Sequence, residues 1–258
     1  MDLQLSDRLF IVCGASDGLG RGICQALLAE GARVLAVGRS PEKLAALAGD
    51  SSDRCQTLAL DLTADDGPAQ VLAALAGKAP SGVVLNAGGP PVGLAAETTG
   101  AEWDAAYRLV FRWKAELVTG LLPAMRKATP GRILFVESQG VKQPIPGLAQ
   151  SNAMRSAVVG YAKTLSQELA TTGITVNVLA PGAHDTAALE RVTQARQQAW
   201  ELDRDATRER MQAAIPVGRF GAAEEFGCLA AWLLSPHSGY ITGQVISHDG
   251  GNIQGLFG

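Results

Sequence analysis

A short apolar run followed directly by a glycine-rich turn constrains this chain more than any other feature. Leu9–Cys13 is apolar, Gly14, Gly18 and Gly20 follow with Gly-x-x-x-Gly-x-Gly spacing, and a helical pattern continues through Ala29. Glycines let a backbone approach a pyrophosphate closely, and the free N–H groups at a helix N-terminus favour its negative charge. The stretch predicts a strand, a tight turn and a helix that together bind a dinucleotide.

Composition limits the remaining possibilities. The chain has 258 residues and is 47% hydrophobic, enough for one α/β domain with a sizeable core. A net charge of −3 without a basic run indicates no nucleic-acid partner. There is no secretory signal pattern and no apolar run of 18 residues, so we expect a soluble, cytoplasmic protein without a membrane partner. The four cysteines lack metal-ligand spacing, which predicts buried free thiols and no metal site.

Further strand-and-turn motifs follow in a fixed order. Apolar runs are expected to form strands at Arg33–Val37, Leu58–Leu60, Val83–Leu85, Arg132–Val136 and Ile174–Ala180. With the glycine turn, these motifs resemble the short-chain dehydrogenase/reductase family over essentially residues 5–251. The resemblance implies a single-domain Rossmann-type α/β fold, a doubly wound parallel sheet in three layers, with a substrate-covering lid at about residues 187–214.

The resemblance also implies a set of cofactor-binding residues, mostly in the turns that follow the strands. They are Gly14, Ser16, Asp17, Gly18, Leu19, Gly20, Arg39, Asp61, Leu62, Asn86, Ala87, Gly88, Pro181, Gly182 and Thr186. The second strand ends without the acid that would bind a ribose 2′-hydroxyl, and Arg39 can pair a 2′-phosphate instead. We therefore expect NADP rather than NAD. Arg39 could also simply lie in solvent, and Asp17 would weaken a nearby phosphate.

The active-site motif is altered. Ser138 ends a strand, as the family's catalytic serine does. In the family a tyrosine follows thirteen residues later and a lysine four residues after that, but these counts reach Ser151 and Arg155 here. The family's helix asparagine is likewise replaced by Val110. The resemblance is closest to an atypical 3-oxoacyl-carrier-protein-reductase-like branch that lacks the Tyr/Lys pair.

Three functional interpretations remain open. In the first, hydride adds to an enone, and Ser138, Arg155 and Asn152 hold the resulting enolate. In the second, water or His184 supplies the proton to a small ketone. In the third, the chain is a non-catalytic, cofactor-binding partner or sensor on the same fold. We take an NADP(H)-dependent oxidoreductase acting on a small molecule as the working hypothesis.

Structural roles are alternatives for most of these residues. Ser151 and Asn152 could cap the helix expected to begin near Ser151, in which case Ser151→Ala would cost little activity. Arg155 could form an ion pair with Glu137, and His184 could be an ordinary loop histidine.

Assembly is the last expectation from the sequence. Apolar positions such as Leu109, Leu117, Val158 and Leu165 lie in the expected helices 102–126 and 152–169. In the family these two helices form an interface between subunits, so we expect a homotetramer or homodimer.

Overall fold

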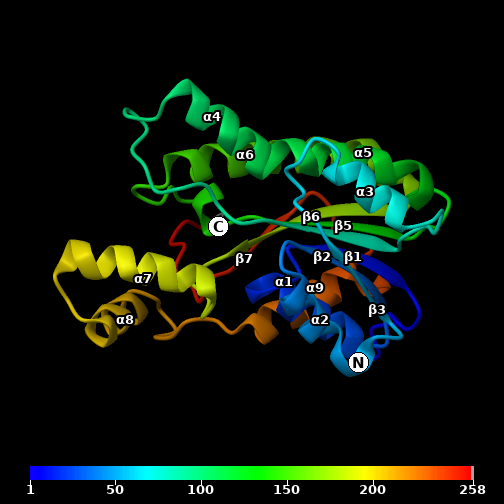
Figure 1. The fold of residues 1–258 in the computed structure, drawn as a ribbon, viewed down its shortest axis with the longest axis horizontal. Helices are drawn as coiled ribbons and strands as arrows, with labels where there is room; N and C mark the ends of the chain where they lie inside the picture. Colours follow the sequence, from blue (N-terminus) through cyan, green and yellow to red (C-terminus); the bar gives the residue numbers. More distant parts are fainter. Residues whose placement is uncertain (257–258) are drawn as a thin grey trace.

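Seven parallel strands form the centre of the computed structural model, which describes residues 1–256 (Figure 1). Their order across the sheet is β3-β2-β1-β4-β5-β6-β7. The chain winds outward from β1 to β3, then crosses back to β4 and continues to the other edge. In such sheets ligands bind beyond the carboxyl ends of the strands where the direction reverses. The strands are β1 (Leu9–Cys13), β2 (Arg33–Gly38), β3 (Cys55–Ala59), β4 (Gly82–Asn86), β5 (Gly131–Val136), β6 (Ile174–Pro181) and β7 (Val245–His248).

Helices cover both faces of the sheet, so the predicted three-layer Rossmann-type architecture is confirmed. Figure 1 shows α3, α4, α5 and α6 above the sheet and α1, α2 and α9 below it, while α7 and α8 extend beyond its edge. The helices are α1 (Gly18–Ala29), α2 (Pro41–Ala48), α3 (Gly67–Ala74), α4 (Gly100–Tyr107), α5 (Trp113–Met125), α6 (Ala149–Leu169), α7 (Ala187–Trp200), α8 (Arg204–Ala213) and α9 (Ala223–Leu234).

The apolar strands supply both cores at once. Successive side chains of a strand point to opposite faces, and a parallel sheet is buried on both of them. Phe10 and Val12 of β1 therefore pack in the cluster between the sheet and helices α1 and α9. Ile11 and Cys13 pack in the cluster between the sheet and helices α5 and α6. This alternation explains why the strands read as continuous apolar runs.

The expected helix 102–126 is divided. A π-helical turn, Arg108–Arg112, separates α4 from α5, and the indole Nε1 of Trp113 donates to the Leu109 carbonyl at 2.9 Å. Val110, in the place of the family's asparagine, is buried inside this turn. Isolated π-helical turns within α-helices frequently occur at functional sites.

Three other boundaries differ from expectation. The third strand begins at Cys55 rather than Leu58 because it pairs with β2 along its whole length, from Val34 to Gly38. The helix expected near Ser151 begins two residues earlier, at Ala149. Residues 187–214 form two helices, because Glu201 adopts a left-handed conformation (φ 53°) that ends α7. Within residues 1–256, no helix combines the length and apolarity needed to cross a membrane.

Candidate active site

The glycine-rich turn brings β1 and the start of α1 into very close contact. Gly14 and Gly18 have φ values of 66° and 51°, which favour glycine. A Cβ at Gly20 would lie 2.0 Å from the Gly14 carbonyl oxygen, so no larger residue fits there. Leu19 is partly buried against the core below the sheet. The turn thus presents backbone N–H groups of α1 at the carboxyl end of β1, as the sequence predicts.

Asp17 caps α1 and is charge-compensated. Its carboxylate accepts a hydrogen bond from Gly18 N at 2.7 Å and forms an ion pair with Lys43 of α2. The hydrogen bond from Lys43 is the main reason why the pKa of Asp17 lies below its ordinary value. A phosphate near Asp17 would therefore meet Lys43 as well as the carboxylate.

The ends of β2 and β3 lie beside this turn. Arg39 is exposed, and no ion pair involving it occurs within residues 1–256. A Cβ at Gly38 would lie 3.0 Å from Ser16 Oγ, so an acidic side chain there would crowd the turn. Asp61 accepts from the backbone N–H and hydroxyl of Thr63, and these bonds lower its pKa. Leu62, the next predicted residue, packs against the upper core.

The turn after β4 connects the cofactor turn to the centre of the site. The Asn86 side chain donates to the Gly14 carbonyl at 3.4 Å. The Ala87 carbonyl accepts from Arg155 Nη2 at 3.5 Å. A Cβ at Gly88 would meet no atom within 4 Å, whereas one at Gly89 would lie 3.5 Å from Arg155 Nη2. Small residues therefore keep this side of the site open.

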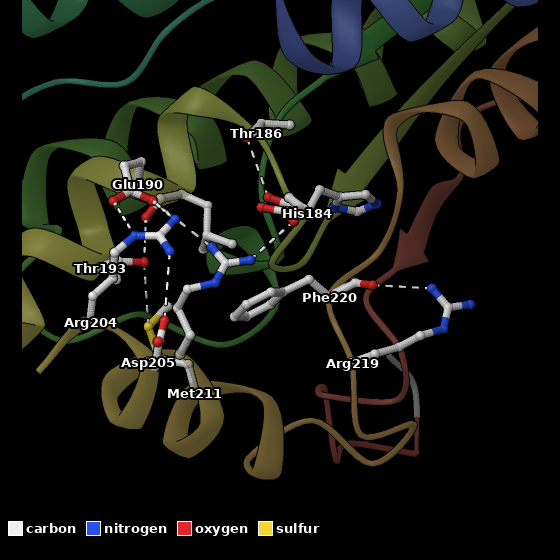
Figure 2. A network of polar contacts seen from close by, with 12 residues as sticks. His184, Thr186, Glu190, Thr193, Arg204, Asp205, Met211, Arg219 and Phe220 are labelled. Atoms are coloured by element: carbon white, nitrogen blue, oxygen red, sulfur yellow. Dashed lines mark hydrogen bonds and ion pairs between the residues drawn. The ribbon is translucent and has the colours of Figure 1, made fainter.

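The turn after β6 lies opposite the glycine turn. A Cβ at Gly18 would be 3.3 Å from the Thr186 side chain, so the two turns approach each other. The Thr186 hydroxyl donates to the His184 carbonyl at 3.3 Å (Figure 2). Gly182, which follows Pro181, is crowded by Asp249 and could not carry a larger side chain. An open cleft of about 530 Å³ runs from Asp17 and Gly18 past Thr186 to Glu190 of α7.

His184 is fixed by both ring nitrogens. Its Nδ1 lies 3.1 Å from the Gly182 carbonyl oxygen, and its Nε2 lies 2.9 Å from Nδ1 of His248. Burial is the main reason why the pKa of His184 lies below its ordinary value. The ring has no free nitrogen with which to reach a substrate.

Ser138 stands at the carboxyl end of β5. Its hydroxyl oxygen accepts from Gly140 N at 3.1 Å, and its own hydrogen has no acceptor within residues 1–256. Asn152 is used differently, because its amide donates to the Ile145 carbonyl at 2.9 Å and accepts from Ile145 N at 3.3 Å. Asn152 therefore pins the loop between β5 and α6, and the structure does not direct its amide to a ligand.

The capping interpretation of Ser151 is wrong. The N-cap of α6 is Leu148, and Ser151 lies in the first turn of the helix, where it is buried. Its hydroxyl oxygen instead accepts from Nε of Arg155, one helical turn later, at 3.1 Å. The Ser151 hydrogen has no acceptor in the described part of the chain, so it can be donated to a bound molecule.

Arg155 is the centre of a buried ionic network. Its Nη1 lies 3.1 Å from Glu137 Oε2 and 3.5 Å from the Val136 carbonyl oxygen. The ion pair with Glu137 that the sequence left open is therefore present. Glu137 Oε1 in turn binds Lys114 Nζ at 2.5 Å. All three charged side chains are almost completely buried, with whole-residue exposures of 6%, 4% and 1% for Arg155, Glu137 and Lys114.

Comparisons with known proteins identify the family of this chain. A family model described as enoyl-(acyl carrier protein) reductase matches residues 14–252. Nodulation protein G of Rhizobium sp. (strain N33) is 34% identical, covering 96% of this chain and 98% of that protein. The chain belongs to the short-chain dehydrogenase/reductase family. It is therefore an oxidoreductase of the short-chain type.

Two further relatives are reductases. The 3-oxoacyl-[acyl-carrier-protein] reductase FabG of Escherichia coli (strain K12) is 29% identical over 96% of this short-chain oxidoreductase and 98% of that enzyme. The structure of an actinorhodin polyketide ketoreductase with NADPH is 28% identical and superposes with a TM-score of 0.89, covering 95% of this chain and 97% of that one.

Lys114 is the site residue of this short-chain oxidoreductase that sequence reasoning missed. It lies between Trp113 and Leu117, two of the apolar residues of the expected helix 102–126, and its place next to Trp113 was the available signal. Burial is the main cause that lowers its pKa, and the carboxylate of Glu137 opposes that shift. The nearby Cys13 thiol, whose pKa burial raises to about 12, stays protonated and adds no charge.

Proposed function

We propose that this short-chain oxidoreductase is an NADP(H)-dependent reductase with an atypical, tyrosine-free site that stabilises an oxyanion. The observation that carries this proposal is the Ser151 hydroxyl, which accepts a hydrogen bond from a buried guanidinium and has its own proton free. Ser138 also has a free hydroxyl proton. Two such donors support the negative charge that develops on a substrate oxygen during reduction.

The contacts of Arg155 define its role in this proposal. Its four hydrogen bonds to protein groups leave little of the five-donor guanidinium for a ligand. Direct contact between Arg155 and the enolate, as the first interpretation of the sequence has it, therefore suits this geometry less than an indirect effect. Arg155 orients Ser151 and strengthens it as a donor, because a positive charge beside a hydroxyl makes its proton more acidic.

The substrate class follows from the proton demand. A serine hydroxyl is a poor proton donor, so Ser138 and Ser151 suit a reaction whose product is a stabilised anion. NADPH, when bound, would supply a hydride to the substrate. We therefore favour conjugate reduction of an enone, whose enolate the two hydroxyls hold until water protonates it. Reduction of a small ketone is the second candidate, and there water must donate the proton because both nitrogens of His184 are occupied.

Three features support NADP as the cofactor. Arg39 is exposed and can pair a 2′-phosphate, an acidic side chain at position 38 would crowd Ser16, and the related polyketide ketoreductase is described with NADPH. Titration of tryptophan fluorescence with NADPH and NADH would test the assignment. Arg39→Ala should weaken NADPH binding by about tenfold, the loss of one charged hydrogen bond, and leave NADH unchanged. Equal affinities for both cofactors in the unaltered protein would refute it.

Activity is tested with a panel of enones, quinones and β-ketoesters, followed at the nicotinamide absorbance with NADPH. Ser138→Ala and Ser151→Ala should each lower turnover by about a hundredfold, the usual effect of losing one oxyanion donor. The matched control is Ser156→Ala, because that hydroxyl is exposed and donates to the Asn152 carbonyl of its own helix. If no compound of the panel is reduced while NADPH still binds, the result would favour the interpretation as a non-catalytic partner or sensor.

We also propose a cytoplasmic homotetramer or homodimer, although the apolar positions first invoked do not carry this idea. Leu117, Val158 and Leu165 are buried within the single chain. A cluster of aromatic rings supports assembly better. Phe111 stacks on the exposed Tyr107 and makes an edge contact with Tyr161 of α6, and the ring centroids are 5.7 Å apart in both pairs. Light scattering that finds a monomer at micromolar concentration would contradict assembly.

A further inference from the structure

A continuous chain of hydrogen bonds runs from the interior to the proposed site. Lys114 Nζ binds Glu137 Oε1 at 2.5 Å, Glu137 Oε2 binds Arg155 Nη1 at 3.1 Å, and Arg155 Nε donates to Ser151 Oγ at 3.1 Å. The chain connects α5, the end of β5 and the first two turns of α6. Ser151, at its outer end, lies beside the open turn at Gly89.

The network contains two cations and one carboxylate. Within residues 1–256, Glu137 is the only acid paired with Lys114 or Arg155. The network therefore holds one positive charge in excess when both cations are protonated. Burying an uncompensated charge is costly because the charge loses its hydration, yet the same low-dielectric surroundings make it act strongly on an anion placed nearby.

We propose that Lys114 and Glu137 are positioning residues whose joint role is to leave this excess positive charge behind Ser151. Glu137 orients Arg155 but neutralises only one of the two cations. The remaining positive charge attracts the bound molecule electrostatically, and Arg155 and Ser151 are the groups of the network that lie nearest to it. The ligand favoured there carries an anionic oxygen, such as an enolate or a carboxylate. This inference rests on the proposed function, since it assumes that Ser151 faces the substrate.

Charge-altering variants separate this role from simple packing. Lys114→Met leaves Glu137 and Arg155 as a neutral pair. The double variant Lys114→Met with Glu137→Gln restores one net positive charge, on Arg155. If the charge matters, the double variant recovers what the single variant loses. If only packing matters, the second change adds further damage.

The probe is acetate, with the uncharged acetamide as its control, added to the NADPH-loaded protein and followed by the fluorescence of the bound nicotinamide. Lys114→Met should weaken acetate binding by about tenfold or more, the size of one charged hydrogen bond, with acetamide and NADPH binding unchanged. The double variant should return to within about threefold of the unaltered protein, since it regains the charge. Ser151→Ala should also weaken acetate, because it removes the outer end of the chain.

Several outcomes would overturn the inference. They are acetate affinity unchanged by Lys114→Met, a double variant weaker than the single one, and no acetate binding by the unaltered protein. If Lys114→Met does not fold, the double variant and Ser151→Ala still decide, since the first must keep acetate binding and the second must lose it. The expected acetate pattern without turnover on any substrate would refute the proposed function alone. Turnover with acetate binding indifferent to Lys114 would refute the network alone.

Discussion

Two glutamates in this molecule are each shared by two cationic side chains, but in opposite surroundings. Glu137 lies between Lys114 and Arg155 with no side-chain exposure. Glu190 of α7 lies between Arg204 and Arg208 of α8, at 3.0 Å and 3.9 Å, with 35% of its side chain exposed (Figure 2). Both networks place one carboxylate between two cations, but the first is buried and the second is open to solvent.

The difference shows what burial does to a carboxylate that is shared by two cations. Water screens the exposed network, and Arg208 has further partners in Asp185, at 3.0 Å, and the Phe220 ring, at 4.9 Å. Arg204 is the main reason why the pKa of Glu190 is lowered, and losing that contact leaves the ions solvated. The buried network has no water to replace a missing partner. We therefore expect the exposed network to contribute little to the stability of the α7–α8 segment. The buried network should contribute strongly to the free energy of unfolding and should hold the site residues in place.

The largest expected effect is that of Glu137→Gln. This change leaves Lys114 and Arg155 buried without a carboxylate, and breaking a buried ion pair in this way costs about 3–5 kcal/mol. The free energy of unfolding, measured by urea denaturation at neutral pH, should fall by that amount. Adding Lys114→Met should recover part of the loss, because it removes one of the two stranded cations. A loss below about 1 kcal/mol would mean that the network is hydrated and the comparison with Glu190 fails.

An intermediate effect is expected from His184, a buried group that is held neutral. Burial lowers its pKa in the folded state, so on acidification the unfolded chain binds the proton first, from about pH 6.5. Stability should therefore decline as the pH falls below about 6.5 and level off below the folded-state pKa. Each unit of separation between the two pKa values corresponds to about 1.4 kcal/mol.

Urea denaturation at neutral and at mildly acidic pH measures this decline. His184→Asn should flatten it, and His237→Asn, a change at an exposed histidine, serves as the control. The carboxylates with lowered pKa, such as Asp17 and Asp61, lose their stabilising ionisation only at lower pH and do not interfere. A pH dependence that survives His184→Asn would assign it to another group.

The smallest effect is expected from Glu190→Gln. Its partners remain solvated, so the melting temperature should change by at most about 2 °C. Added salt at about 1 M should remove even this difference, because it screens exposed charges. Glu137→Gln under the same conditions provides the contrast, since a buried ion pair is screened much less. If Glu190→Gln lowered the melting temperature as much as Glu137→Gln does, and independently of salt, the two networks would not differ in the way proposed.

Local pattern was enough to predict much of the architecture. The strand at Leu9–Cys13 has the same bounds in the structure, and the predicted tight turn after it contains two glycines with positive φ. These features depend on neighbours within a few residues, so the sequence shows them directly. Ser138 was likewise predicted from its place at a strand end, although its role remains a proposal.

The boundaries of the helices and the contacts of the buried side chains were harder to predict from the sequence. The π-helical turn at Arg108–Arg112 and the start of α6 at Ala149 depend on packing against other elements. Asn152 binds the backbone of Ile145 rather than facing a ligand, and a pattern of residue types cannot distinguish these two uses.

By itself, the sequence determined the parallel sheet, the glycine turn and the positions at which a serine and an arginine replace the family's tyrosine and lysine. Only the tertiary structure decided what these replacements contact. Lys114 and Glu137 are 23 residues apart and Glu137 and Arg155 are 18 apart, and they meet because α5 and α6 pack over the same end of β5. Whether a buried lysine finds a carboxylate depends on that packing, since charge pairing in a protein interior requires contact across elements rather than proximity along the chain.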